Sequence, residues 1–298
     1  MKMTTSIQAV LLASAVISPL IGVQSASTPE IEKEAILQTA LDYSDGAYSS
    51  DASRLERALH PDLTKVIFNR KSPVMGLASR YSTFSDLVEP ARTKMFFLEP
   101  DKRLTESSVL KLKGDVACVR VKTAMWCDYL QMIKVNGRWK IINVLWTNGL
   151  DTPPQAKVVP GFDAGKERPA AQAAALDYIE GRLSGDIVRL EKAIHPETNH
   201  VTFMAMEAAG TKVAFISRSR YSGIVESARA KIGLPPENAR KAEVRILDLM
   251  DGMAFAVAEA ASGTSYLQLQ LMDGQWKAIN ILTRPANNLI SPPPGVKK

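Results

Sequence analysis

One aspartate inside an apolar segment is the first candidate for chemistry. Asp128 stands between Trp126 and Leu130 in a run whose two-residue period predicts a strand. Burial there would raise the pKa of the carboxyl group and make it a possible general base. The alternative is a structural carboxylate that pairs across the predicted hairpin with Arg120 or Lys122.

Two histidines form a second candidate because they occupy matching places in the chain. His60 and His195 each precede a proline after a short helical segment. An imidazole can transfer protons near neutral pH, so His60 could act as a catalytic acid or base. In the other interpretation the His-Pro pair ends the helix, and the imidazole is hydrogen-bonded to the backbone.

Tryptophan and asparagine side chains near Asp128 could complete a pocket. Trp126 begins the first strand of the predicted hairpin and Trp146 ends the second, although tryptophan in a small domain is most often part of the core. Asn143 lies among apolar strand residues, which indicates a buried amide that satisfies backbone or pocket groups. The predicted ligand-binding set is therefore Trp126, Asp128, Asn143, Trp146 and His60.

Several common kinds of site are not supported by the sequence. It has no His/Cys/Asp cluster with metal-ligand spacing, no glycine-rich phosphate loop and no Gly-x-Ser-x-Gly segment. We therefore expect no metal and no cofactor. The formal net charge is +6, but the basic residues are scattered and not interleaved with aromatics. This pattern favours a solvated basic surface and no nucleic-acid partner.

The chain contains two copies of one domain. Short segments of the first half recur in the second at an offset of 135 to 140 residues: Ala-Leu-Asp-Tyr (40–43 and 175–178), Arg-Leu-Glu (54–56 and 189–191), Ser-Arg-Tyr-Ser (79–82 and 219–222) and Gly-x-Trp-Lys (137–140 and 274–277). Such self-similarity at a nearly constant period indicates a duplication.

Helices precede strands within each copy. In the first copy, apolar periodicity predicts helices over 29–48, 54–59 and 83–94 and strands over 109–112, 116–122, 126–135 and 139–146. The apolar stripe of the first helix is predicted as Ile31, Ala35, Leu37, Ala40 and Leu41. Asn136-Gly137 predicts a tight hairpin between the last two strands, because both residues tolerate positive φ. Helices followed by an antiparallel meander give an α+β fold.

The ends and the middle of the chain differ from these two copies. Lys2, an apolar run over 7–23 and the small residues Ser25 and Ala26 are typical of a secretory signal peptide, with a membrane anchor as the alternative. The expected division is a signal peptide (1–25), domain 1 (26–148), a linker (149–169), domain 2 (170–284) and a tail (285–298). We therefore expect a periplasmic or secreted protein with no membrane association after signal cleavage.

Two cysteines raise the question of a disulfide in an oxidising compartment. If the turn between their strands centres on Met125, Cys118 pairs near Met132 and Cys127 points to the opposite face. This register predicts two free, buried thiols, and a shift by one residue would reverse the prediction.

Four segments of the first copy carry a resemblance to a known family: 40–43, 54–62, 115–121 and 128–146. They closely resemble the bacterial "putative lumazine-binding" family of the nuclear transport factor 2-like (cystatin-like cone) superfamily. The second copy has diverged, with Gly263, Ser265 and Thr283 where the first has its Trp-x-Asp and final tryptophan. The resemblance implies a curved antiparallel sheet wrapped around helices to form a cone with an interior pocket. Related domains pair through the outer faces of their sheets, so the two copies would pack as an intrachain pseudo-dimer.

The superfamily includes ketosteroid isomerase, scytalone dehydratase, polyketide cyclases and non-catalytic binding proteins, so fold alone does not select a function. Its isomerases combine a carboxylate base with a tyrosine, but Asp128 and Tyr129 are adjacent in a strand and must point to opposite faces. The leading hypothesis is an exported, non-catalytic protein that binds a small, partly apolar molecule in domain 1. The alternatives are a cofactor-free isomerase, dehydratase or cyclase that uses Asp128 or His60, and a protein-interaction module.

Overall fold

The computed structural model describes residues 28–70, 77–149, 159, 161–208 and 211–286. The predicted signal peptide lies outside the described residues, as do about half of the predicted linker and most of the predicted tail. Within the described part of the chain, no helix is long and apolar enough to cross a bilayer.

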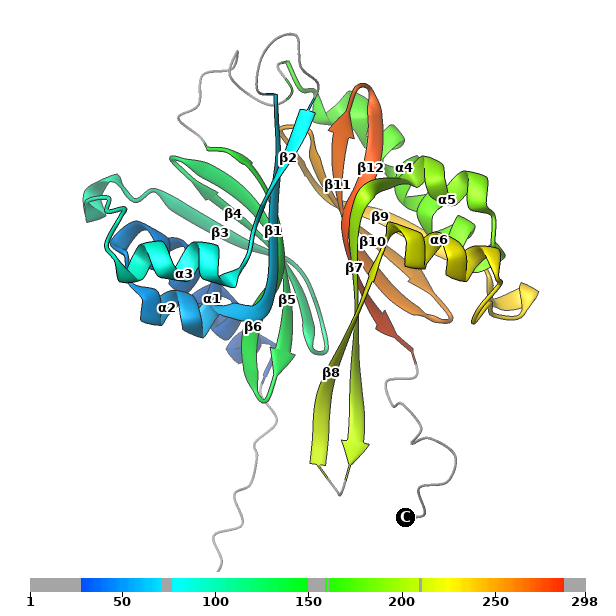
Figure 1. Ribbon diagram of the computed structural model, residues 1–298, viewed down its shortest axis with the longest axis horizontal. Coiled ribbons are helices and arrows are strands. Elements are labelled where there is room, and N and C mark those ends of the chain that lie inside the picture. The colour runs from blue at the N-terminus through cyan, green and yellow to red at the C-terminus, as the bar shows by residue number, and fades with distance from the viewer. Residues whose placement is uncertain (1–27, 71–76, 150–158, 160, 209–210, 287–298) are drawn as a thin grey trace, which may run out of the picture.

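The described residues form two α+β domains (Figure 1). Domain 1 contains α1 (Pro29–Ser49), α2 (Ala52–Ala58), β1 (Leu59–Arg70), β2 (Leu77–Ser82), α3 (Phe84–Arg92), η1 (Pro100–Lys102), β3 (Thr105–Lys113), β4 (Val116–Thr123), β5 (Trp126–Val135) and β6 (Arg138–Asn148). Domain 2 contains α4 (Ala164–Ser184), α5 (Ile187–Ala193), β7 (Ile194–Ala208), β8 (Thr211–Arg220), α6 (Tyr221–Arg229), η3 (Glu237–Ala239), β9 (Ala242–Met250), β10 (Met253–Ala260), β11 (Gly263–Met272) and β12 (Gln275–Pro285).

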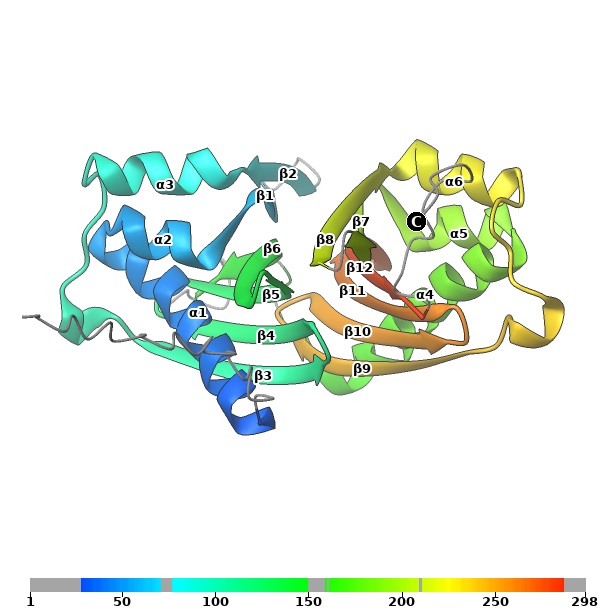
Figure 2. The same cartoon turned by 90° about the horizontal axis from the view of Figure 1, so that it is seen from below.

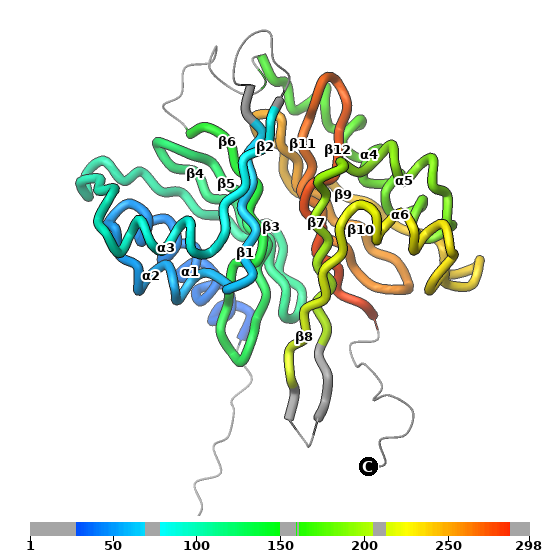
Figure 3. Tube along the Cα trace, viewed as in Figure 1, coloured from blue at the N-terminus to red at the C-terminus, as the bar shows by residue number. Residues whose placement is uncertain are grey.

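The two sheets have the same topology. Their strand orders are β2-β1-β6-β5-β4-β3 and β8-β7-β12-β11-β10-β9, each with six strands. The first long strand of each domain runs parallel to the last, and the other neighbours are antiparallel. The Cα trace in Figure 3 follows the same path in both halves. The predicted tandem α+β fold is therefore confirmed.

Local sequence signals explain several of the element ends. The Thr28 side chain caps α1, and Thr83 forms a reciprocal capping box with Asp86 at the start of α3. Asn136 and Gly137 take φ values of 50° and 77° in the tight turn between β5 and β6, as predicted.

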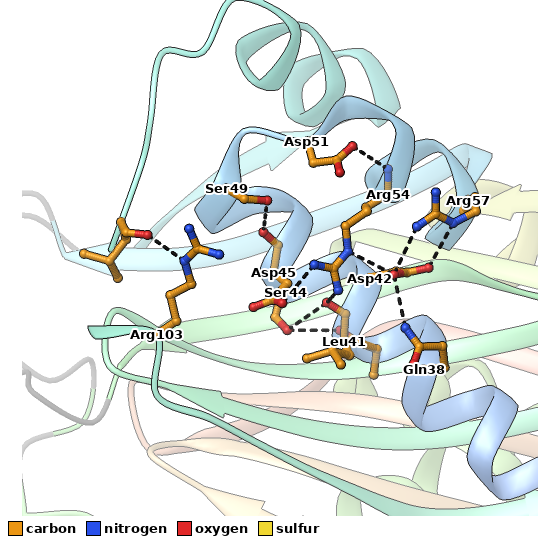
Figure 4. Close-up of polar contacts among 12 residues, drawn as sticks. Gln38, Leu41, Asp42, Ser44, Asp45, Ser49, Asp51, Arg54, Arg57 and Arg103 are labelled. Atoms are coloured by element: carbon orange, nitrogen blue, oxygen red, sulfur yellow. Dashed lines mark hydrogen bonds and ion pairs between the residues drawn. The ribbon is translucent and has the colours of Figure 1, made fainter. Parts of the chain in front are cut away.

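The repeated Asp and Arg residues connect the short helix of each domain to the long one, and Figure 4 shows the contacts of domain 1. Arg54 Nε donates to Asp42 Oδ1 at 3.0 Å, and Arg57 Nε lies 3.2 Å from Asp42 Oδ2. Burial opposes the charge of Asp42, but the bonds from Arg57 and Arg54 outweigh it and lower its pKa. In domain 2, Arg189 pairs with Asp177 at 3.0 Å. These repeated motifs therefore have a structural role.

Strands β1 and β2 were not predicted from the sequence. β1 starts at Leu59, immediately after α2, and contains Pro61 as its third residue. A proline argues against a central strand, because it cannot donate a ladder hydrogen bond. The His60-Pro61 pair therefore ends α2 and begins the strand that crosses the middle of the domain.

The predicted apolar stripe of α1 was also wrong in part. Ile31 and Leu41 are exposed, whereas Ile36, Ala40 and Tyr43 are buried against the sheet. The helix has apolar residues on more than one side, so sequence periodicity alone did not define which side faces the core.

Three apolar clusters hold the molecule together. One lies between helices and sheet in each domain. The third lies between the two sheets and includes Phe68 and Tyr129 of domain 1 and Phe203 and Phe255 of domain 2. Figures 1 and 2 show the sheets facing each other in the middle, with the helices of each domain on the far side. The two copies pack as the pseudo-dimer that the resemblance implied.

A buried polar network crosses this interface with the same pattern from each side. Its paired hydrogen bonds are Gln131 Nε2 to Tyr266 O (2.8 Å), Gln268 Nε2 to Tyr129 O (2.7 Å), Asn143 Nδ2 to Gln131 Oε1 (2.8 Å) and Asn280 Nδ2 to Gln268 Oε1 (2.8 Å). Asn143 Oδ1 also accepts a hydrogen bond from Asn199 at 2.8 Å. The structure therefore places Asn143 between the domains, away from any pocket of domain 1.

Both cysteines are free and buried, as predicted, but the predicted geometry was wrong. Cys127 pairs with Lys122 and Cys118 pairs with Gln131, so both side chains lie on the same face of the sheet. Cys118 was expected to pair near Met132, so the observed register of β4 and β5 differs from the expected one by one residue. The two positions are four residues apart along neighbouring strands, about 13 Å, which is too far for a disulfide.

Candidate functional site

Domain 1 contains a cavity of 320 Å³ between its helices and its sheet. Its polar lining residues come from several elements and include Tyr43 of α1, Lys65 of β1, Arg80 and Ser82 of β2 and Asp86 of α3. Trp126 of β5 and Trp146 of β6 lie in the wall together with apolar residues that include Leu55, Leu87 and Phe96. Apolar walls with a few convergent polar groups are typical of small-molecule sites.

A buried ion pair lies at the wall of this cavity. Lys65 Nζ is 3.3 Å from Asp128 Oδ1 and also donates to the hydroxyl oxygen of Tyr43. Asp128 is 0% exposed and Lys65 is 7% exposed. Asp128 Oδ2 accepts no hydrogen bond from the part of the chain that the structure describes. The pair is therefore incompletely satisfied, which is unusual for a purely structural contact.

Burial affects both partners of this pair. It raises the pKa of Asp128 despite the opposing Lys65 ammonium, and it lowers the pKa of Lys65 despite the Asp128 carboxylate. Both shifts favour the neutral forms, because a low-dielectric site disfavours charge. Transfer of a proton from Lys65 to Asp128 therefore costs less here than in water.

Aromatic rings surround the Lys65 amine. Nζ lies 4.7 Å from the ring centroid of Trp146, 5.1 Å from that of Tyr43 and 5.8 Å from that of Trp126. Tyr48 stacks on Trp126 at 4.3 Å. Cation–π contacts of this kind partly compensate the ammonium for lost hydration.

The structure brings together three of the sequence-predicted site residues. Asp128 and Trp146 are direct cross-strand partners, and Trp126 lies two residues from Asp128 on the same face. Asp128 itself is not part of the cavity lining, and Lys65 stands between it and the cavity. The expected partners of Asp128 were wrong, because Arg120 instead pairs with Asp248 of domain 2 at 3.1 Å.

His60 lies away from this group. Its Nδ1 accepts a hydrogen bond from the backbone N–H of Asp62 at 3.0 Å, and His195 makes the equivalent bond to Glu197 at 3.1 Å. Neither histidine lines the cavity of domain 1. The geometry of both copies therefore matches the structural interpretation of the His-Pro pair.

Sequence reasoning missed Lys65, Tyr43 and the role of Arg80 at the cavity. The guanidinium of Arg80 lies 5.3 Å from the ring centroid of Trp146. A lysine directly before the apolar run Val66–Phe68 was a signal that could have identified Lys65.

The matching cone of domain 2 has different chemistry. His200 is the counterpart of Lys65. Thr64, which precedes Lys65, pairs with Asn143 of β6, and Asn199, which precedes His200, pairs with Asn280 of β12. His200 Nε2 lies 2.9 Å from Thr283 Oγ1, which lies 2.9 Å from Ser265 Oγ. These are neutral hydrogen bonds, and no ion pair among the described residues occupies this place.

His200 should make the stability of the protein depend on pH. Burial lowers its pKa to about 3 from the ordinary 6.5. A lowered pKa in the folded state gives a contribution that is present above pH 6.5 and is lost as the pH falls below it. Between pH 7 and pH 4, the free energy of unfolding of the wild type should fall by about 3 kcal/mol more than that of His200→Gln.

Urea unfolding of both proteins at the two pH values, followed by circular dichroism, measures this difference. His195→Gln is the matched control, because His195 is only half-buried and its replacement should remove much less of the pH dependence. An equal loss of stability in wild type and His200→Gln would contradict the prediction.

The comparison with family models decides the family. The model described as "Putative lumazine-binding" matches residues 31–147 and again residues 166–282. The chain belongs to this family. Both of its domains are nuclear transport factor 2-like cones, as the resemblance implied. No curated protein matches the chain.

Among solved structures, the chain is similar to nuclear transport factor 2-like proteins of unknown function from Silicibacter pomeroyi (17% identity, 40% of this chain and 98% of the other, TM-score 0.35) and Shewanella baltica (16%, 41% and 96%, TM-score 0.34). A "putative dehydratase" of the same fold family from Streptomyces avermitilis is also similar (12%, 41% and 99%, TM-score 0.30). Each of these alignments covers less than half of this chain.

Proposed function

We propose that this member of the family binds a small, flat, partly apolar molecule in the cone of domain 1. The observation that carries the proposal is the 320 Å³ cavity in which Lys65 meets the rings of Trp126 and Trp146. Its volume lies at the small end of the range of about 300–1,000 Å³ for ligand sites. The ligand is therefore small.

The lining indicates the chemistry of the ligand. Trp126 and Trp146 offer ring surfaces for a planar molecule, and Lys65 and Arg80 offer positive charge and hydrogen-bond donors. A planar heterocycle with carbonyl or acidic groups satisfies both features. Lumazine, which the family description names, is such a bicyclic compound and is the first probe to use.

The proposal includes export and a non-catalytic role. The basic start and apolar run of residues 2–23 support export. The position of Asp128 behind Lys65 supports binding over the isomerase alternative, because the carboxylate does not line the cavity. The intact mass of the protein recovered from host cell fractions tests export, since a signal peptide would be missing from it.

Filling the cavity should weaken ligand binding. Ser82 lines the cavity, and Ser82→Phe places a ring in it, so the dissociation constant for lumazine should rise by about tenfold or more. Quenching of tryptophan fluorescence measures binding, since Trp126 and Trp146 are in the wall. The duplication offers a matched control: Ser222 ends the same Ser-Arg-Tyr-Ser segment in domain 2, and Ser222→Phe should leave affinity unchanged.

The same proteins should be denatured and the released small molecules identified by mass spectrometry. A specific compound that is present in wild type and Ser222→Phe but absent from Ser82→Phe would support the proposal and identify the natural ligand. Equal binding by the two variants would exclude the domain 1 cavity as the site.

A further inference from the structure

We propose that the Lys65 amine forms an imine with an aldehyde or ketone group of the ligand. Domain 1 would then capture carbonyl compounds covalently and reversibly. This inference rests on the proposed function, because the same cavity receives the ligand. Among the described residues that line this cavity, Lys65 is the one amine.

The surroundings of Lys65 are those of a nucleophilic lysine. A lysine reacts with carbonyl carbon only as the neutral amine, and an apolar pocket favours that form. Lys65 is almost fully buried among the rings of Tyr43, Trp126 and Trp146. Burial also lowers its pKa, which increases the neutral fraction near neutral pH.

The charged and titratable groups that face Lys65 come from each neighbouring element. Asp128 of β5 is the acceptor for its proton, and burial raises the pKa of that carboxyl group. Arg80 of β2 disfavours a second positive charge and further lowers the pKa of Lys65. Tyr43 and Tyr48 of α1 have raised pKa values, because they are buried, and so remain neutral.

The reaction balances with these groups alone. Lys65 passes a proton to Asp128, the neutral Nζ attacks the carbonyl carbon, and the carbonyl oxygen takes a proton from the attacking nitrogen. The resulting carbinolamine loses its hydroxyl group as water, with the proton from the Asp128 carboxyl group. The products are an imine and one water, without oxidation or reduction. The protonated imine then keeps the Asp128 carboxylate as its counter-charge, as the ammonium did.

Two other sites of the molecule provide internal controls. In domain 2, His200 and Ser265 lie where Lys65 and Asp128 lie in domain 1, and neither of these described residues carries an amine that could form an imine. Lys140 is also partly buried and its pKa is also lowered by burial. Its Nζ donates to the backbone oxygen of Glu56 at 2.7 Å, outside the cavity. Lys140 therefore separates the effect of burial from the effect of the site.

The test is reductive trapping of the full chain with 4-formylbenzoate, a flat aldehyde whose carboxylate suits Arg80. The protein is incubated at pH 6.5 with this probe and cyanoborohydride, which reduces imines to stable amines, and the modified lysines are identified by peptide mass mapping. Lys65 should be modified at least about tenfold faster than Lys140 or any exposed lysine, because the cavity holds the aldehyde beside the Lys65 amine and so makes the attack effectively intramolecular. Asp128→Asn should slow Lys65 modification by about tenfold or more, because general acid–base assistance is lost.

The comparison of Lys65 with the other lysines uses peptide mass mapping of the wild type alone, so it does not depend on the folding of a variant. Modification of Lys65 at or below the rate of exposed lysines would overturn the proposal, as would equal rates in wild type and Asp128→Asn. Benzoate, which has the same ring and carboxylate but no aldehyde, separates this failure from that of the proposed function. If benzoate quenches tryptophan fluorescence while Lys65 stays unmodified, binding in the cavity stands and imine formation fails.

Discussion

Asp128→Ala is expected to reduce the free energy of unfolding by about 3–5 kcal/mol, the usual cost of removing one partner of a buried ion pair. The variant leaves the Lys65 ammonium buried with no counter-charge, and it also leaves a void at a fully buried position. Neutralisation of Lys65 would limit the loss at high pH, and protonation of Asp128, whose pKa burial raises, would remove the ion pair from the wild type at acidic pH. The difference from the wild type should therefore be largest near neutral pH.

Urea unfolding followed by tryptophan fluorescence measures this loss, because three of the four tryptophans lie in domain 1. Asp62→Ala is a matched control. The Asp62 side chain is mostly exposed and lies 3.8 Å from His60 Nδ1, so its replacement should change stability by less than about 0.5 kcal/mol. Equal stability of Asp128→Ala and wild type would mean that Lys65 is not held as an ammonium by Asp128.

A double variant separates the charge from the packing. Lys65→Met with Asp128→Leu replaces both charged groups by apolar side chains of similar size, and such replacements are often neutral. We expect it to recover most of the stability that Asp128→Ala loses. A folded double variant that no longer binds the ligand would show that the Lys65–Asp128 ion pair is needed for ligand binding and not for the stability of the domain.

The residues of the site differed in how far the sequence could reveal them. Trp126, Asp128 and Trp146 belong to one hairpin, and the period of two along its strands places them on one face. The same period excludes Asn143, which lies three residues before Trp146 and so points the other way, into the interface. Strand parity was therefore a signal that the sequence contained and that the predicted ligand-binding set did not use.

The place of Lys65 in the site could not be predicted from local sequence patterns. Its strand, β1, pairs in parallel with β6, so that Lys65 lies opposite Val144, almost 80 residues along the chain. Parallel pairing has no turn to set its register, and here the register also shifts between Leu59 and Thr64. The Lys65–Asp128 contact therefore depends on the tertiary fold, whereas the hairpin contacts depend on the sequence of one segment.

Phe255→Ala in domain 2 is expected to reduce the free energy of unfolding by about 3–5 kcal/mol. Phe255 is fully buried between the two sheets, and its ring centroid lies 5.3 Å from that of Tyr129 of domain 1. The substitution leaves a cavity in the apolar cluster that joins the copies. Phe215→Ala is the matched control, because Phe215 is 45% exposed and should cost less than about 0.5 kcal/mol.

Tryptophan fluorescence of Phe255→Ala also tests whether domain 1 depends on domain 2 for its stability. Phe255 belongs to domain 2, but three tryptophans report on domain 1. If Phe255→Ala shifts the unfolding midpoint of the tryptophan signal, domain 1 depends on its neighbour, and the second copy stabilises the cone that holds Lys65. If only circular dichroism shifts, the domains unfold independently and the stabilising role of domain 2 is contradicted. The interface hydrogen bonds of Gln131 and Gln268 cross between the sheets in both directions, which favours the first result.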